Sequence, residues 1–207
     1  MTIAIAIPAR YGSTRFPGKP LAKIGGQSML SRVVDLAQKV AAERDDISVF
    51  VTTDDHRIED HARAIGAACI MTPESCATGS DRVLSALRQL DPWPDFVLNL
   101  QGDAPFTPIS VVQAVIDCLQ NDPHTQVATP VHRLSWDDLD RLRAAKTQTP
   151  FSGTTAVVND AGHALWFSKN ILPAIRKEDD LRTSEAFSPV YQHIGLYGYR
   201  VDILEKF

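Results

Sequence analysis

The feature that most constrains the fold is an alternation of short apolar runs with longer amphipathic stretches. Runs such as Ile3 to Ile7, Ile47 to Val51 and Phe96 to Leu100 have the composition of buried strands. Each is followed by a polar loop and then by apolar residues at helical spacing, as over residues 28 to 42. The alternation occurs roughly four times by residue 121, which predicts an α/β fold with a doubly wound, mainly parallel sheet and right-handed crossovers.

The second half of the chain is less regular. A strand is predicted over residues 127 to 131, and Ser135 with Asp138 forms a pattern that resembles a capping box and opens a short helix. Two β-rich runs, Thr155 to Val158 and Ala164 to Phe167, flank Asn159-Asp-Ala-Gly and predict an antiparallel hairpin extension.

The last part of the chain predicts a loop and then a strand. Residues 167 to 190 are charged and mixed, which favours a loop, whereas residues 191 to 200 are β-like. Because no repeat or linker divides the chain, residues 1 to 207 are expected to form a single domain.

Composition excludes several classes of protein. The 207 residues carry a net charge of −4, and the pI is near 5.8, which argues against a general nucleic-acid or membrane-surface binder. Three cysteines without a close pair fit neither a disulfide framework nor a zinc site, so a reducing, cytoplasmic compartment is expected. The apolar run Ile3 to Ile7 is too short for a signal segment or a membrane span.

The loop after the first predicted strand has the composition of an anion site. It carries three cations, two hydroxyls and two glycines within about ten residues, an inventory suited to a polyphosphate. A Walker A loop is excluded, because five residues separate the glycines and a proline follows the lysine. The residues concerned are Arg10, Gly12, Ser13, Thr14, Arg15, Gly18, Lys19 and Pro20.

The spacing P-A-R-x-x-S-x-R-x-P-x-K-P in this loop resembles the signature of the sugar-activating cytidylyltransferases, most closely the 3-deoxy-manno-octulosonate (Kdo) cytidylyltransferase family, the CMP-Kdo synthetases. Asn99 to Pro105 resembles the family motif V-Q-G-D-E-P, and Thr78 to Arg82 resembles S-G-T-D/E-R. Segments that begin at Thr52, Ala164 and His193 also look like family segments, so the resemblance covers essentially the whole chain.

The resemblance implies a Rossmann-like nucleotidyltransferase fold and a reaction that couples CTP to Kdo, with CMP-sugar and pyrophosphate as products, for lipopolysaccharide or capsule synthesis. It implies that Arg10, Lys19 and Asp103 are catalytic. The implied CTP-binding residues are Ala9, Arg10, Ser13, Arg15, Lys19, Thr78, Gly79 and Arg82, and the implied sugar-binding residues are Gln101, Ser168, Lys169, His193 and Tyr197.

Asp103 is also the expected metal ligand. It lies just past the carboxyl end of a predicted central strand, and an oxygen ligand of this kind suits Mg²⁺. Without the resemblance, Asp103 is interpreted as a helix cap or turn residue. Thr78 to Arg82 is then interpreted as a helix N-cap, either Thr78 or Ser80, with a salt bridge between Asp81 and Arg82.

Departures from the family pattern keep other functions open. Ala104 replaces a family Glu, Gly153-Thr-Thr-Ala-Val lacks a family Lys, and Gln192 stands where Arg often precedes the His. The missing Lys and Gln192 lie on the sugar side, which leaves open an enzyme like CMP-sialic acid synthetase that acts on another acidic sugar. Ala104 and the missing Lys leave open a non-catalytic CTP-binding protein.

The resemblance also concerns the end of the chain. Family members continue beyond a segment like Tyr197 to Arg200 and carry a late D-x-P-x-D motif, whose first Asp is a second metal ligand; Asp202 does not match it. The chain is therefore expected to lack the family's C-terminal segment, at a cost in activity. A homodimer is implied, with residues 150 to 200 as the sugar-side and dimerisation subregion.

Overall fold

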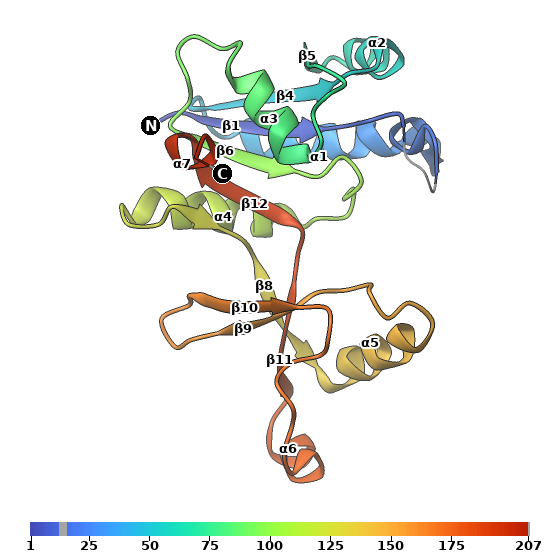
Figure 1. Cartoon of the computed structure of the whole chain (residues 1–207), viewed down its shortest axis with the longest axis vertical. Coiled ribbons are helices and arrows are strands. Elements are labelled where there is room, and N and C mark those ends of the chain that lie inside the picture. The colour runs from blue at the N-terminus through green and yellow to red at the C-terminus, as the bar shows by residue number, and fades with distance from the viewer. Residues whose placement is uncertain (13–15, 207) are drawn as a thin grey trace. The chain divides into compact units, whose positions relative to one another are not determined.

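The computed structural model describes residues 1–12 and 16–206. The chain separates into two compact units: a large unit, Met1–Ala128 with Gly195–Phe207, and a small unit, Thr129–Ile194 (Figure 1). The sequence shows no linker between the two units. The chain passes from one unit to the other at residues 128/129 and 194/195, and both points lie in or beside stretches with strand composition. The division is a property of which residues pack together.

The large unit is built on a six-stranded sheet in the order β5-β4-β1-β6-β12-β7. Its first four strands in that order are mutually parallel, and β12 and β7 pair antiparallel at one side. The predicted doubly wound, mainly parallel sheet is confirmed. The strands are β1 (Ile3–Pro8), β4 (Ile47–Thr53), β5 (Ala68–Met71), β6 (Phe96–Leu100), β7 (Val127–Ala128) and β12 (Leu196–Arg200).

Helices cover both faces of this sheet. Because successive strand residues point to opposite faces, β1 sends Ile3, Ile5 and Ile7 into one core and Ala4 and Ala6 into another. The first core is closed by α1 (Met29–Ala41), α2 (His56–Ala64) and α4 (Ile109–Asn121), and the second by α3 (Gly79–Leu87) and α7 (Val201–Leu204). Figure 1 shows α3 in front of the sheet and α1 behind it.

Short elements connect β1 to α1: the 3-10 helix η1 (Lys19–Leu21) and a small hairpin of β2 (Lys23–Ile24) and β3 (Gln27–Ser28). Ser28 caps α1 by accepting a hydrogen bond from the Ser31 backbone N–H at 2.9 Å. Among the described residues, no helix has the length and apolar character needed to cross a membrane.

The small unit contains an antiparallel sheet in the order β10-β9-β11-β8, packed against α5 (Trp136–Gln148). The predicted hairpin is confirmed as β9 (Thr155–Val158) and β10 (Ala164–Ser168). The other strands are β8 (Val131–Ser135) and β11 (Phe187–His193). Leu134, Trp136, Leu139, Leu142 and Val190 form its core.

Three predictions for this half of the chain were wrong in detail. The strand expected over residues 127–131 is two strands separated at Thr129 and Pro130, since proline has no N–H for a sheet hydrogen bond. The helix expected to be short, α5, has 13 residues.

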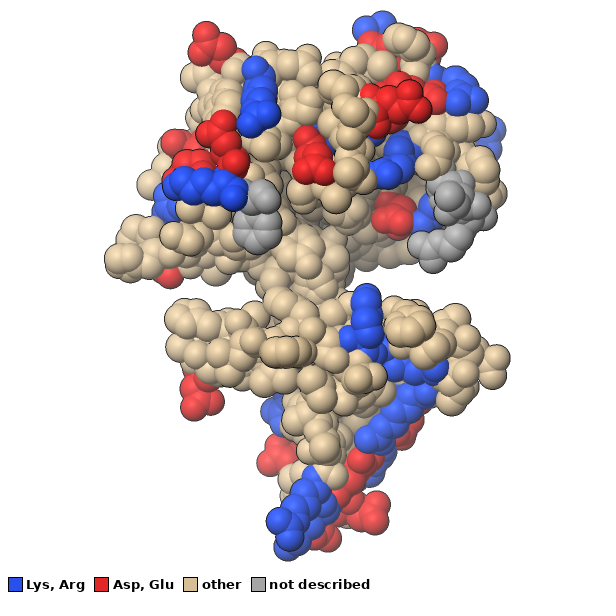
Figure 2. Space-filling view, in the orientation of Figure 1, with Lys and Arg blue, Asp and Glu red and all other residues tan. Residues whose placement is uncertain are grey.

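The loop expected over residues 167–190 holds α6 (Glu178–Ser184) and the first residues of β11. Glu178 on α6 forms ion pairs with Arg143 on α5 and with Arg182, both at 2.7 Å. Figure 2 shows basic and acidic side chains next to one another in this part of the small unit. The pair between Glu178 and Arg143, 35 positions apart, is not visible in local composition.

Candidate functional site

The candidate site lies at the carboxyl edge of the large unit's sheet, where β1 and β6 are neighbours. The strand order runs from β1 outward through β4 to β5 and then resumes at β6 on the other side of β1. The strand order therefore reverses direction between β1 and β6, which is called a topological switch point. Loops that leave the strands on either side of it diverge, and open α/β sheets bind ligands in the crevice between those loops. Here the two loops carry Arg10 to Lys19 and Gln101 to Asp103.

A cavity of about 600 Å³ lies at this crevice. Its volume falls in the range of small-molecule sites, roughly 300–1,000 Å³. Seven residues predicted for the site line it: Ala9, Arg10, Lys19, Gly79, Arg82, Gln101 and Asp103. The rest of the described lining is Pro8, Gly12, Phe16, Pro20 and Gly102. Two further predicted residues, Ser13 and Arg15, lie outside the described residues.

Lys19 and Asp103 meet in this cavity. The Lys19 ammonium donates a hydrogen bond to Asp103 Oδ2 at 2.6 Å, although 84 positions separate the two residues. Their side chains are 36 % and 54 % exposed, so both stay accessible to a ligand. A cation suited to phosphate and a carboxylate suited to a metal ion thus form an ion pair in the cavity lining.

Backbone geometry brings these two loops close together. A side chain at Gly102 would place its Cβ 2.8 Å from the Pro8 carbonyl oxygen, so only glycine allows the β6 loop to pass the end of β1. Gly18 has φ +70°, which favours glycine, and it turns the chain into η1. Pro20 is buried in η1 and fixes the backbone next to Lys19.

Asp103 does not cap a helix. The following helix, α4, has Pro108 at its N-cap, and the described contacts of the Asp103 carboxylate include Lys19 only. The cap interpretation of Asp103 is therefore wrong, but Asp103 does lie in a turn, where the Ala104 N–H donates to the Gln101 carbonyl at 3.0 Å.

The cap interpretation of Thr78 is confirmed. Thr78 Oγ1 accepts from the Asp81 N–H at 3.1 Å, and Asp81 accepts from the Thr78 N–H at 2.8 Å, a complete capping box.

The start of α3 faces the cavity through Gly79. Backbone N–H groups in the first turn of a helix attract anions and hydrogen-bond acceptors. Asn99 connects this turn to the β6 loop, because its amide donates to Ser80 Oγ at 3.4 Å and accepts from Gln101 at 3.1 Å. Gln101, Asn99 and Ser80 at the start of α3 thus form one hydrogen-bonded chain.

Arg82 lines the cavity but is almost completely buried, with 1 % of its surface exposed. Its guanidinium donates to Asp54 Oδ2 and to Thr72 Oγ1, each at 2.7 Å. The expected salt bridge with Asp81 is wrong, since Asp54 occupies that role. Asp54 and Thr72 are site residues that the sequence reasoning missed; the resemblance of the segment from Thr52 to a family motif was the available signal.

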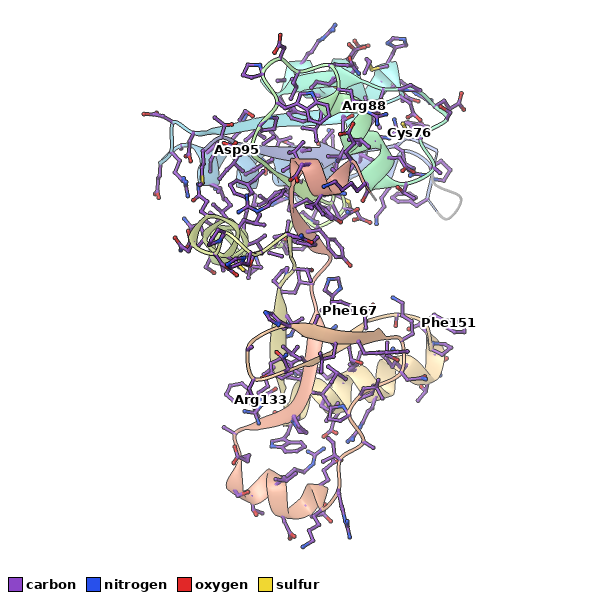
Figure 3. All side chains as sticks on the ribbon, turned by 60° about the vertical axis from the view of Figure 1, so that its left-hand side comes forward. Cys76, Arg88, Asp95, Arg133, Phe151 and Phe167 are labelled. Atoms are coloured by element: carbon purple, nitrogen blue, oxygen red, sulfur yellow. The ribbon has the colours of Figure 1, made fainter. Side chains whose placement is uncertain are left out.

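Arg10 is exposed, and its guanidinium donates to the Ala77 carbonyl at 3.3 Å. This contact ties the β1 loop to the residue before the α3 cap. Cys76, labelled in Figure 3, lies in the same connecting loop and is a free thiol.

Three residues predicted for the sugar side belong to the small unit. Lys169 donates to Thr154 Oγ1 at 2.7 Å, and Ser168 lies opposite Thr155 in the β9–β10 ladder. His193 shares a hydrogen bond of 2.7 Å with Thr129. Burial, aided by the charge of Lys169, lowers the pKa of His193 below its usual value, which favours the neutral imidazole.

Aromatic and basic residues surround this group. The ring of Phe167, labelled in Figure 3, packs edge-on against His193 with centroids 5.1 Å apart. Lys146 on α5 donates to the carbonyl oxygens of Lys169 and Gly153 at 2.6 and 3.1 Å. Like Asp54 and Thr72, Lys146 is a residue that sequence reasoning missed, because these partners are backbone atoms.

The other two residues predicted for the sugar side, Gln101 and Tyr197, belong to the large unit. Tyr197 lies on β12 opposite Asn99 of β6, and its ring stacks on Tyr199 with centroids 6.1 Å apart. Burial raises the pKa of the Tyr197 hydroxyl, so that it stays protonated at neutral pH.

Comparison with known proteins gives consistent matches. The family model described as Cytidylyltransferase matches residues 4–207. A 3-deoxy-manno-octulosonate cytidylyltransferase from Maricaulis maris is 47 % identical over 206 residues, which are 99 % of this chain and 76 % of that protein. The protein of the same name from Parabacteroides distasonis is 38 % identical over 202 residues, covering 97 % of this chain and 75 % of its own length.

Solved structures agree with these matches. A CMP:2-keto-3-deoxy-manno-octonic acid synthetase in complex with CTP superposes with a TM-score of 0.81 at 34 % identity, over 100 % of this chain and 77 % of that one. A 4-diphosphocytidyl-2C-methyl-D-erythritol synthase from Anaerococcus prevotii has a TM-score of 0.56 at 16 % identity, over 99 % of this chain and 74 % of that one. The second match supports the fold alone.

Proposed function

We infer that this chain, which belongs to the cytidylyltransferase family and within it to the 3-deoxy-manno-octulosonate cytidylyltransferases, joins Kdo to CMP. The anomeric hydroxyl of Kdo attacks the α-phosphorus of CTP. The bond between that phosphorus and the oxygen that bridges it to the β-phosphorus breaks, and pyrophosphate leaves with the bridging oxygen. The observation that carries the proposal is the pairing of Lys19 with Asp103 at 2.6 Å in a cavity between the β1 and β6 loops.

Lys19 and Arg10 are proposed to hold the triphosphate. Charge-assisted hydrogen bonds from a loop cation to phosphate oxygens are strong and geometrically selective. On CTP binding, the Lys19 ammonium moves from Asp103 to a phosphate oxygen, and the exposed Arg10 guanidinium supplies further donors. Ser13 and Arg15 of the same loop are proposed to assist. Positioning and charge stabilisation of this kind carry most of the rate in phosphoryl-type transfers.

Asp103 is proposed to hold Mg²⁺. It fits that ion because it is a half-exposed oxygen ligand and the acidic residue among the described cavity lining. Mg²⁺ uses one or two protein carboxylates together with substrate phosphates. When bound, the ion would offset the negative charge that develops at the α-phosphate. Breaking the Lys19 pair frees both side chains for these tasks together.

The start of α3 is proposed to recognise cytosine. Thr78 caps α3, Gly79 opens its first turn at the cavity, and the Arg82 N–H holds that turn by donating to the Thr78 carbonyl. Gln101, Ser168, Lys169, His193 and Tyr197 are proposed to contact the acidic sugar. A cation and a neutral imidazole supply donors suited to a sugar carboxylate and hydroxyls.

We further propose the cellular setting. The activated sugar would serve lipopolysaccharide or capsule synthesis, and the free thiols of Cys69, Cys76 and Cys118 are typical of a cytoplasmic protein. A homodimer is proposed, with residues 150–200 contributing to the sugar side and the interface. Exposed Phe151, Leu165, Trp166 and Phe187 in that region favour a contact surface.

The test measures pyrophosphate release with CTP and Mg²⁺ in the presence of Kdo, 8-amino-Kdo or sialic acid. Release that depends on Kdo supports the proposal. Release with sialic acid alone would assign the chain to the other acidic-sugar branch. CTP binding without release in the presence of any of these sugars would favour a non-catalytic CTP-binding protein.

A further inference from the structure

The segment Asp54 to Arg57, here called the Asp54–Arg57 turn, runs from the end of β4 into the first turn of α2. It lies outside the cavity lining, but Asp54 contacts Arg82 of that lining and Arg57 contacts Tyr11 of the β1 loop. Each of its two aspartates pairs with a different arginine: Asp54 with Arg82 at 2.7 Å and Asp55 with Arg57 at 2.6 Å. The proposed reaction gives this turn no task. Its contacts nevertheless lead to the start of α3 on one side and to the β1 loop on the other.

The first route runs from Asp54 through Arg82 to α3. Arg82 lies in the first turn of α3, and its backbone N–H donates to the Thr78 carbonyl at 3.2 Å. Its guanidinium is 2 % exposed as a side chain, and within the described residues its buried Nε has no hydrogen-bond partner. The charge of a buried guanidinium needs a close anion, and Asp54 supplies it. Removing that charge should loosen Arg82 and with it Thr78 and Gly79.

The second route runs from Arg57 through Tyr11 to Lys19. Asp55 accepts two hydrogen bonds from the Arg57 guanidinium, at 2.9 and 2.6 Å, and so fixes its plane. That plane lies over the Tyr11 ring, with Cζ 3.3 Å from the ring centroid.

Tyr11 passes this constraint to the residue before Lys19. The Tyr11 carbonyl accepts from the Gly18 N–H at 2.9 Å, and a Cβ on Gly18 would lie 3.1 Å from the tyrosine ring. The Tyr11 ring thus lies beside Gly18, and the Tyr11 backbone is hydrogen-bonded to it, so the way Tyr11 is held bears on Gly18 and on Lys19, the next residue in sequence.

We propose that the Asp54–Arg57 turn is a positioning segment that sets the two halves of the nucleotide site separately. Asp54 sets the base side through Arg82, and Arg57 sets the phosphate side through Tyr11. Neither residue lines the cavity, so each acts through another side chain. This inference rests on the proposed function, in which Lys19 holds phosphate and the α3 start recognises cytosine.

The experiment separates the two halves with three probes: CTP, UTP and inorganic tripolyphosphate, titrated by calorimetry at fixed Mg²⁺. In the Asp54→Asn variant the preference for CTP over UTP should fall about tenfold, by analogy with the loss of outer partners that orient metal ligands, while the affinity for tripolyphosphate is retained. In the Arg57→Lys variant, which keeps the charge but loses the planar stack, affinity for all three should fall by a common factor.

Matched controls exist for both changes. Asp46→Asn removes a carboxylate that pairs with Arg44 at 2.8 Å at the other end of β4. Arg63→Lys changes an arginine on the same helix as Arg57 with a similar exposed side chain, 66 % against 60 %, and an ion pair to Glu59. Both controls should bind all three probes like the unchanged chain. Melting temperatures identify any variant that is unfolded.

The outcomes distinguish a failure of the proposed function from a failure of the positioning role. If the unchanged chain does not bind CTP, the proposed function fails. If it binds CTP and prefers it to UTP, but folded Asp54→Asn and Arg57→Lys behave like their controls, the positioning role is overturned and the proposed function stands. Equal losses for all three probes in both variants would also overturn it, because they would show no separation between base and phosphate sides.

Discussion

Two ion pairs, one between two residues of the cavity lining and one that reaches the lining through Arg82, have nearly the same length and different surroundings. Asp54 and Arg82 are 2.7 Å apart with side chains 17 % and 2 % exposed, whereas Lys19 and Asp103 are 2.6 Å apart with 36 % and 54 % exposed. Buried charges depend on their partner, while exposed ones exchange it for water or ligand at little cost. Burial, rather than distance, therefore distinguishes a structural ion pair from one that a bound substrate can break.

The largest expected effect is on the buried pair. Asp54→Ala leaves the Arg82 guanidinium buried without an anion, which should lower the free energy of unfolding by about 3–5 kcal/mol. Urea unfolding measures this. The double variant Asp54→Ala, Arg82→Met should recover part of the loss, because an apolar side chain suits the buried space. A loss below about 1 kcal/mol, the scale of an exposed pair, would erase the distinction between the two pairs.

The next effect concerns Asp103 and falls on turnover. Asp103→Asn retains the shape of the side chain but removes the anionic ligand, so pyrophosphate release should fall by about a hundredfold or more. The melting temperature should barely change, because the lost ion pair is exposed. Near-normal release by this variant would remove Asp103 from the mechanism, and Asp46→Asn serves as the control for loss of an aspartate charge.

Lys19→Ala should weaken CTP binding by about 1.5–3 kcal/mol, the scale of a charge-assisted hydrogen bond. Calorimetric titration with CTP measures it, and the melting temperature should again stay close to that of the unchanged chain. Lys39→Ala, on the last turn of α1, is a suitable control for removal of an exposed lysine. An unchanged affinity for CTP would show that the β1 loop is not the phosphate site.

The smallest effect extends the comparison to the small unit. Hydrogen bonds from Arg143 and Arg182 lower the pKa of Glu178 to about 2. Its folded value lies below its unfolded one, so the stabilisation is present at neutral pH and is lost as the pH falls from the ordinary carboxyl range through about 2. Melting curves of the unchanged chain and of Glu178→Gln should therefore converge as the pH is lowered. A constant difference between them across that range would contradict a role for the Glu178 charge.

Local pattern was sufficient for much of the fold. The run Ile3 to Ile7 predicts a buried parallel strand because its residues are apolar on both faces, and the structure divides them between two cores. Helix α1 follows its apolar spacing almost to the residue. The β9–β10 hairpin follows from two β-rich runs around Asn159-Asp-Ala-Gly.

In the second half of the chain, local pattern gave a wrong prediction, a loop over residues 167–190 that in fact holds α6. Helix α6, in the stretch predicted as a loop, carries Glu178, which contacts Arg143 from another helix. Charged composition alone indicates a loop, since composition does not show which charges will meet.

By itself, the sequence determined the family, the α/β alternation and the residue types of the site, because these depend on neighbours within one loop, strand or helix. Only the tertiary structure decided how those residues are used. It brought Lys19 to Asp103 across 84 positions, buried Arg82 against Asp54 instead of Asp81, and divided the strand predicted over residues 127–131 between two units. The physical reason is that each of these outcomes is set by strand order and packing, which join residues that no local spacing relates.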